Sequence, residues 1–189
     1  MPPDAGQVRD EERDAQAEAR RLAALAQIRQ YPDPALRIRA REVETFDGDL
    51  KRLVERMSRL MEEASGVGLA APQVGILQRV FVFHREEDEV EAVVNPRIVD
   101  GSEERETDEE GCLSIQGVRV PVERSASVVV EGRDPDGGEL RLELAGLPAR
   151  VAQHEIDHLD GTLILDRTDE EHRRAALAAL RPRPVLSHG

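Results

Sequence analysis

The sequence predicts an α+β fold in which mostly antiparallel strands pack around a central helix that carries an HExxH motif. Two observations predict this class. Several short β-rich runs are joined by turn residues rather than by helices, and amphipathic helical segments lie before and after them in the chain. At 189 residues the chain is long enough for one domain with a sizeable core.

Composition restricts the partners and the location of the protein. The formal net charge of −13 argues against general nucleic-acid binding. Aromatic residues make up only 2% of the chain, so the core must be built from Leu, Val, Ile and Ala. No apolar run is long enough to span a bilayer, and there is no secretory h-region. We therefore expect a cytoplasmic protein without membrane contact.

The N-terminal part of the chain, residues 1–27, is predicted to be an extension that is disordered or helical. Pro2, Pro3 and Gly6 predict disorder at its start. Residues 10–29 are rich in Ala, Glu and Arg and carry a thin apolar stripe, which predicts a helix. A solvated tail is the alternative.

The clearest helix in the sequence is predicted from about residue 47 to residue 64, after a Pro-punctuated loop at 31–37. Asp47 or Asp49 can cap its start, and Gly66 lies just past its end. Apolar residues follow the i, i+3, i+4, i+7 spacing of one buried helix face. These residues are Leu50, Leu53, Val54, Met57, Leu60 and Met61.

Five strand-like runs follow this helix. They cover residues 80–83, 90–99, 118–122, 127–132 and 140–144, and the second run is broken by Asn95 and Pro96. The last two runs flank the sequence DPDGG, a strong turn signal, so they predict a hairpin.

Two further helices are predicted, one from about 147 to 161 and one from about 168 to 180, before an Arg/Pro tail. The predicted divisions of the chain are an extension at 1–27, a catalytic domain at 28–168, and a C-terminal helix and tail at 169–189.

The sequence QHEIDHLDG, at 153–161, points to a metal site. His154 and His158 are four residues apart and therefore lie on one face of a helix, where both imidazoles can bind one ion. Glu155 lies close to such an ion without needing to bind it, and can act as a general base or acid. The alternative is an acidic surface helix with incidental histidines.

Cys112, the single cysteine, is the candidate third ligand. It lies in EEGCLSI, and a thiolate is a good ligand for zinc or ferrous iron. One cysteine and two histidines would leave a fourth tetrahedral position open, as in catalytic sites. A small buried hydrophobic residue is the alternative for a lone cysteine.

A third distinctive stretch is GVGLAAPQVG, at 66–75. Its glycines allow close backbone approach, and Gln73 offers a side-chain amide donor. A phosphate loop is not indicated, because no Lys-Ser or Lys-Thr follows. A tight helix-to-strand turn is the alternative.

Together, these motifs closely resemble those of the peptide deformylases. That family is marked by GφGφAAxQ, EGCLS and QHExDHLxG in this order, which here are GVGLAAPQ at 66–73, EGCLS at 110–114 and QHEIDHLDG at 153–161. All three match without a break, and the resemblance covers about residues 28–167. A peptide deformylase-like fold is therefore expected.

The resemblance implies a metal and a reaction. Cys112, His154 and His158 would bind one divalent metal, usually Fe²⁺, with Ni²⁺, Co²⁺ or Zn²⁺ able to substitute. The implied reaction removes the N-formyl group from the initiator methionine of newly made proteins and releases formate. N-formylmethionyl nascent peptides are therefore the expected partners.

The resemblance also implies roles for individual residues in catalysis. Glu155 would take a proton from the attacking water and later deliver it to the departing amine. The Gln73 amide and the Leu113 backbone N–H would stabilise the charge that develops on the formyl oxygen, together with the metal.

The implied methionine slot includes Val67, Leu147 and Val151, with one flank of His154. The substrate backbone would pair like an added strand with the segment at Gly68 and with residues near Gly111.

Three further positions follow from the comparison of motifs. Glu110 and Arg119 are expected to orient the loop, with an ordinary surface ion pair as the alternative. Gln116 stands where many family members have proline, which predicts a less rigid loop.

The C-terminal segment is basic, with arginines at 173, 174, 181 and 183. Some bacterial relatives use such a segment to dock at the ribosome, and a solvated face is the slightly favoured alternative.

The HExxH motif is also compatible with two other classes of protein. A zincin-like metallopeptidase would share it but should carry a downstream His or Glu ligand. A non-catalytic metal-binding module would close the coordination with a fourth protein ligand, and no second cysteine exists to do so.

Overall fold

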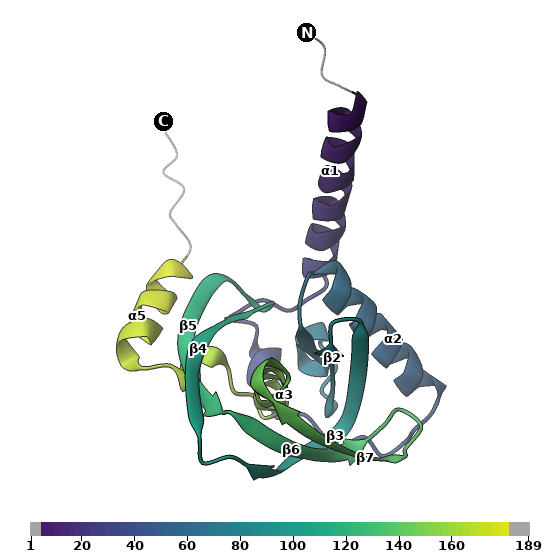
Figure 1. Cartoon of the computed structure of the whole chain (residues 1–189), viewed down its shortest axis with the longest axis vertical. Coiled ribbons are helices and arrows are strands. Elements are labelled where there is room, and N and C mark those ends of the chain that lie inside the picture. Colours follow the sequence, from purple (N-terminus) through teal and green to yellow (C-terminus); the bar gives the residue numbers. More distant parts are fainter. Residues whose placement is uncertain (1–4, 182–189) are drawn as a thin grey trace.

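The histidine-bearing segment forms helix α3 (Gly146–Leu159), which lies in the middle of the molecule with strands around it (Figure 1). The structure is a computed structural model that describes residues 5–181, with side chains from residue 12 onward. Both apolar and charged side chains of α3 are buried, including Ile156 and Asp157. An acidic surface helix, the alternative interpretation of this segment, is therefore wrong.

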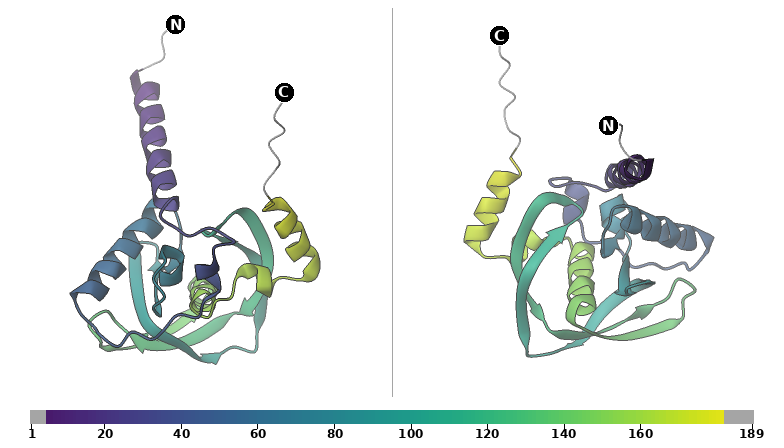
Figure 2. Two further views of the ribbon diagram at one scale, coloured as in Figure 1. Left: turned by 180° about the vertical axis from the view of Figure 1, so that it is seen from behind. Right: turned by 45° about the horizontal axis from the view of Figure 1, so that its top comes forward.

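One wall around α3 is a five-stranded antiparallel sheet in the order β1-β2-β3-β6-β7 (Figures 1 and 2). Its strands are β1 (Gly68–Ala70), β2 (Val80–Glu86), β3 (Glu89–Gly101), β6 (Ser127–Arg133) and β7 (Glu139–Ala145). β6 and β7 pair in register from Ser127 opposite Ala145 to Arg133 opposite Glu139. The hairpin predicted around DPDGG is confirmed.

The second wall is a separate two-stranded sheet made of β4 (Arg105–Cys112) and β5 (Ile115–Ser125). The sequence predicted only the middle of β5 and missed β4. In β4 Glu110 alone is fully buried, so the strand lacks the apolar alternation that reveals a half-buried strand.

Strand β3 is continuous through Asn95 and Pro96, so the predicted break is instead a bulge. Pairing with β6 shifts register between Val94 and Arg97, and Asn95 adopts a positive φ of 51°. The Asn95 side chain accepts from the Val43 N–H at 2.7 Å and donates to the Val43 carbonyl at 2.9 Å. These two bonds hold the bulge against the segment that precedes α2.

Helix α2 (Gly48–Glu63) matches its prediction closely. The Asp47 side chain accepts hydrogen bonds from the N–H groups of Asp49 and Leu50, which satisfies two of the free donors at the helix start. The loop before it, predicted without structure, contains the short 3₁₀ helix η1 (Pro34–Arg37). A second 3₁₀ helix, η2 (Ala71–Val74), follows β1 directly.

Helix α1 (Ala5–Leu25) begins earlier and ends earlier than predicted, and it stands away from the body of the molecule (Figure 1). Gly6 lies inside it, so the predicted disorder at Gly6 is wrong, whereas Pro2 and Pro3 lie outside the described residues. Near the end of α1, Ala24 is buried in the cluster that also contains residues of α2.

The C-terminal region contains α4 (Ile164–Arg167), which was not predicted, and α5 (Glu170–Ala179), which was. Asp169 caps α5 by accepting from the His172 N–H. The tail from residue 182 onward lies outside the described residues. Within residues 5–181, no helix combines the length and apolar character needed to cross a bilayer.

Three apolar clusters hold these elements around α3. One joins α2 to β1, β2 and β3, a second joins α3 to the five-stranded sheet, and a third joins β5 to α4 and α5. Leu, Val, Ile and Ala dominate them, as the composition predicted, and Met57, Met61, Phe81 and Phe83 are also fully buried. α3 thus packs its apolar side chains against the five-stranded sheet.

Candidate active site

Three possible metal ligands converge between the hairpin β4–β5 and helix α3. Cys112 is the last residue of β4, and its Sγ lies 3.3 Å from His158 Nε2. His158 Nε2 lies 3.2 Å from His154 Nε2. The three ligand atoms all lie within 4.8 Å of one another. The structure therefore brings together the residues that two separate sequence motifs suggested.

The donor set and its surroundings fit a divalent cation. Donor atoms that share one tetrahedral ion at ordinary bond lengths lie about 3.3–3.5 Å apart, close to the separations of 3.3 Å and 3.2 Å from His158 Nε2 to Cys112 Sγ and His154 Nε2. The Glu110 carboxylate lies 3.0 Å from His154 Nδ1, which leaves Nε2 facing the other ligands. Burial lowers the pKa of His154, but hydrogen bonds with Cys112 and Glu110 outweigh it and raise that pKa well above its ordinary value. These groups stabilise positive charge at His154, as they would stabilise a bound cation.

His158 differs from His154 because no described carboxylate contacts its imidazole. Burial, followed by the charge of His154, lowers the pKa of His158 well below its ordinary value. The lowered pKa favours the neutral imidazole, which is the form that binds a metal.

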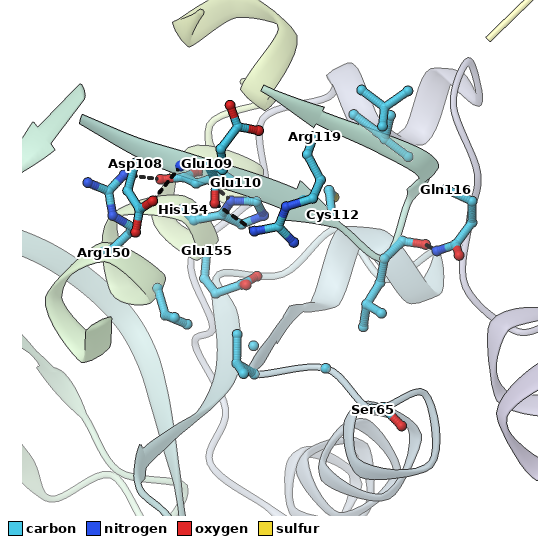
Figure 3. A pocket seen from close by; sticks show the side chains of 18 of the residues that line it. Ser65, Asp108, Glu109, Glu110, Cys112, Gln116, Arg119, Arg150, His154 and Glu155 are labelled. Atoms are coloured by element: carbon cyan, nitrogen blue, oxygen red, sulfur yellow. Dashed lines mark hydrogen bonds and ion pairs between the residues drawn. The ribbon is translucent and has the colours of Figure 1, made fainter. Parts of the chain in front are cut away.

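Glu155 is a buried carboxylate without a hydrogen bond to another described side chain or backbone group. It is 3% exposed, and its Oε2 has no hydrogen-bond partner among the described residues. Burial raises the pKa of Glu155 to about 7. Figure 3 shows the carboxylate pointing into the pocket. An unpaired buried carboxylate is costly, so its presence indicates a functional site rather than a structural contact.

These groups lie at the bottom of a pocket of about 720 Å³ that runs between β1, the hairpin β4–β5 and α3 (Figure 3). Every candidate site residue from the sequence lines it except His158, which is buried behind the others. The lining members of that set are Val67, Gly68, Gln73, Gly111, Cys112, Leu113, Leu147, Val151, His154 and Glu155.

The two predicted oxyanion donors lie beside Cys112. The Gln73 side chain is held by two bonds: Oε1 accepts from the Ala70 N–H at 2.8 Å, and Nε2 donates to Ser114 Oγ at 3.1 Å. The same Nε2 lies 3.8 Å from Cys112 Sγ, so the amide faces the ligands. The backbone of Leu113 forms the turn between β4 and β5.

The turn at Leu113 is held from two sides. Its carbonyl accepts from Gln30 Nε2 at 2.8 Å and from Gln116 Nε2 at 2.8 Å. Figure 3 shows the second bond. Gln116 thus gives the turn a hydrogen bond where proline would restrict the backbone instead.

A buried network of charges lies behind the ligands, and the sequence revealed only one of its members. Arg124 donates from Nε and Nη2 to the Glu110 carboxylate, each at 2.9 Å, and from Nη1 to Asp157 at 2.6 Å. Arg150 donates to Glu110 at 2.8 Å. Arg119, which was expected to orient the loop together with Glu110, donates to the backbone carbonyl of Glu109 at 2.8 Å.

No local signal marks Arg124, Arg150 or Asp157 as buried. Charged side chains ordinarily predict exposure, and the hydrogen-bond partners of these three lie 10 to 44 residues away in the chain. Only the placement of α3 against the hairpin pairs them.

Fold and site together define a class of protein. A thiol and two imidazoles at the end of an open pocket, with an unpaired carboxylate beside them, are the groups that mononuclear metallohydrolases use.

Comparison with known proteins gives the family. The family model described as "Polypeptide deformylase" matches residues 25–174. A peptide deformylase of Thermotoga neapolitana is 51% identical over 140 residues, which are 74% of this chain and 85% of that protein. One from Parafrankia sp. is 44% identical over 154 residues, which are 82% of this chain and 84% of that protein.

Solved structures of peptide deformylases are similar to this chain in fold. The peptide deformylase of Thermotoga maritima superposes with a TM-score of 0.73 at 48% identity, covering 75% of this chain and 96% of that chain. The Synechococcus elongatus peptide deformylase in complex with actinonin gives 0.77 at 38% identity, covering 80% and 85%. The chain belongs to the polypeptide deformylase family.

Proposed function

We propose that this chain removes the N-formyl group from the initiator methionine of newly made proteins and releases formate. The observation that carries this proposal is the convergence of Cys112, His154 and His158 beside the unpaired carboxylate of Glu155 at the end of one pocket. The family to which the chain belongs supports the same reaction.

We propose Cys112 Sγ and the Nε2 atoms of His154 and His158 as the ligands of one divalent metal. A bound divalent ion supplies Lewis-acid chemistry, because it polarises a carbonyl group and lowers the pKa of water. Thiolate and imidazole donors favour Fe²⁺, Zn²⁺, Co²⁺ or Ni²⁺ over Mg²⁺ or Ca²⁺. Fe²⁺ is the proposed resident ion, and the other three are proposed substitutes.

Glu155 is the proposed general base and acid. Its carboxylate, whose Oε2 has no hydrogen-bond partner among the described residues, can accept the proton of the water that attacks the formyl carbon, and can then deliver it to the departing amine nitrogen. The carboxylate is buried, so solvent does not compete strongly for that proton.

Gln73 and Leu113 are the proposed donors to the formyl oxygen as it gains charge. Gln73 is fixed by its bonds to Ala70 and Ser114, so its amide needs little reorganisation during the reaction. The turn at Leu113 is fixed through its carbonyl by Gln30 and Gln116. Removing one such donor typically costs about 3 kcal/mol of barrier.

The substrate is proposed to bind as an added strand. β1 lies at the edge of the five-stranded sheet, so one side of Gly68 is open for backbone pairing, with Gly111 across the pocket. Val67 is 49% exposed and Leu147 62% exposed at the same pocket, and Val151 lies beside them. These apolar side chains suit an unbranched methionine side chain.

Docking at the ribosome is a less supported proposal. Arg174 on α5 pairs with Glu170 at 2.7 Å, so the described part of this segment is mixed in charge rather than basic. This supports a solvated face. Arg183 lies outside the described residues. Co-sedimentation of the full chain with ribosomes, compared with a chain ending at residue 168, tests the docking proposal.

The function is tested with formyl-Met-Ala-Ser and protein loaded with Ni²⁺ or, without oxygen, Fe²⁺. We expect formate release and an intact peptide backbone. Cleavage of internal peptide bonds without formate would favour a zincin-like peptidase, and metal binding without either reaction would favour a non-catalytic module. Neither rival is supported by the site, because Glu155 has a free oxygen and no downstream ligand joins the cluster within the described residues.

A further inference from the structure

The proposed ligands come from two elements that no backbone pairing connects. Cys112 ends strand β4, which pairs only with β5 in a separate two-stranded sheet. His154 and His158 lie on α3. The separation of 3.3 Å between Cys112 Sγ and His158 Nε2 therefore depends on side chains that join the hairpin to the helix.

Arg150 makes three such connections from the helix side. Its Nη1 donates to Glu110 Oε1 and to the Val122 carbonyl, both at 2.8 Å, and its Nη2 donates to the Glu106 carbonyl at 2.7 Å. One guanidinium thus contacts β4 twice and β5 once. It is 9% exposed and lies at the wall of the pocket beside Glu110 (Figure 3).

The contact with Glu110 leads directly to a proposed ligand. Glu110 Oε1 accepts hydrogen bonds from Arg150 Nη1 and Arg124 Nε. Oε2 accepts one from Arg124 Nη2 and contacts His154 Nδ1. Both carboxylate oxygens therefore have two partners, and the carboxylate is fixed in orientation. Arg150 also lies four residues before His154, on the same face of α3.

Arg150 is not needed to neutralise Glu110, because Arg124 already forms a two-pronged ion pair with that carboxylate. Arg150 adds a planar guanidinium group whose two terminal nitrogens donate hydrogen bonds to both β4 and β5. A lysine is a single point charge and cannot reproduce this geometry. The two backbone carbonyls would also lose their buried donor if Arg150 were replaced.

We infer that Arg150 is a positioning residue that clamps the hairpin β4–β5 to α3, and so holds Cys112 and His154 at the separation that one metal ion requires. This inference rests on the proposed metal site.

The test uses the full chain stripped of metal, with Co²⁺ as the probe. Co²⁺ affinity is measured by chelator competition, and the thiolate-to-cobalt charge-transfer absorption reports whether Cys112 is a ligand. We expect Arg150→Gln to weaken Co²⁺ binding roughly 10- to 100-fold and to reduce that absorption. Arg150→Lys keeps one cation and is expected to bind with intermediate affinity.

The matched control is Arg141→Gln on β7, which removes the same charge from an exposed ion pair with Glu131. We expect wild-type Co²⁺ binding from it. Circular dichroism of each metal-free variant checks that it is folded. If Arg150→Gln does not fold, Arg150→Lys tests the positioning role instead. We then expect the Co²⁺ affinity of Arg150→Lys to be about fivefold or more below that of the wild type.

The experiment distinguishes a wrong metal site from a wrong role for Arg150. If the wild type binds no Co²⁺, or binds it without the thiolate absorption, the proposed metal site itself is wrong. If the wild type binds and the folded Arg150 variants bind within about twofold of it, the positioning role is overturned while the metal site stands.

Discussion

Gly68 must be a glycine because its α-carbon faces the Glu155 carboxylate. A Cβ at this position would lie 2.4 Å from Glu155 Oε1 and 2.7 Å from Val151 Cγ1. Ordinary contact begins near 3.4 Å, so the carboxylate of a Gly68→Ala variant must move by about 1 Å. A misplacement of about 1 Å at a catalytic group can cost about 100-fold in rate, which is about 2.7 kcal/mol of barrier.

We therefore expect Gly68→Ala to lower kcat for formyl-Met-Ala-Ser about 100-fold while metal content stays at the wild-type level, since no ligand is touched. Formate release and metal analysis on the same sample measure both. Gly101→Ala is the control, because its Cβ would meet nothing closer than Ser125 Oγ at 3.4 Å. Wild-type kcat from a folded Gly68→Ala protein would refute the placement of Glu155 against this strand.

Three further changes have expected outcomes. Cys112→Ala should leave the chain folded but lose most of its metal, and retention of metal at the wild-type level would remove Cys112 from the ligand set. Gly161→Ala should destabilise the fold by about 2 kcal/mol in urea unfolding, because Gly161 has φ +74° and a Cβ would lie 2.6 Å from the Arg37 carbonyl; an unchanged midpoint would contradict this. Burial raises the pKa of Asp166, but hydrogen bonds from Arg37 and from the Leu163 N–H outweigh it and lower that pKa below its ordinary value. The ionised Asp166 side chain therefore stabilises the fold above about pH 4, and this stabilisation is lost as the pH falls further. Asp166→Asn should be less stable than the wild type at pH 7 and should approach the wild type at acidic pH. An equal loss of stability at both pH values would contradict this role of Asp166.

Much of the fold follows from local pattern. α2 has six apolar residues at helical spacing and a capping aspartate, and both its existence and its start at Gly48 were predictable. The β6–β7 hairpin is joined by the sequence DPDGG, whose residues strongly favour a turn. Such elements are specified by residues close together in the chain.

The elements that escaped prediction depend on distant partners. β4 is polar on both faces, and only its pairing with β5 makes it a strand. The bulge at Asn95 is set by Val43, 52 residues away.

The candidate site shows the same division. Its motifs identify Cys112 and His154 from spacing and chemistry. Arg150 and Asp157 belong to the same buried network, yet their residue types predict exposure until α3 is packed against the hairpin.

We propose that Glu155 moves the proton in a deformylation supported by a metal held at Cys112, His154 and His158. The most direct measurement compares formate release by the wild type and by Glu155→Gln, each at one metal per chain. We expect release by the wild type and a rate lower by about 10²- to 10⁴-fold in the variant, at equal metal content. Equal rates from the two proteins would contradict it.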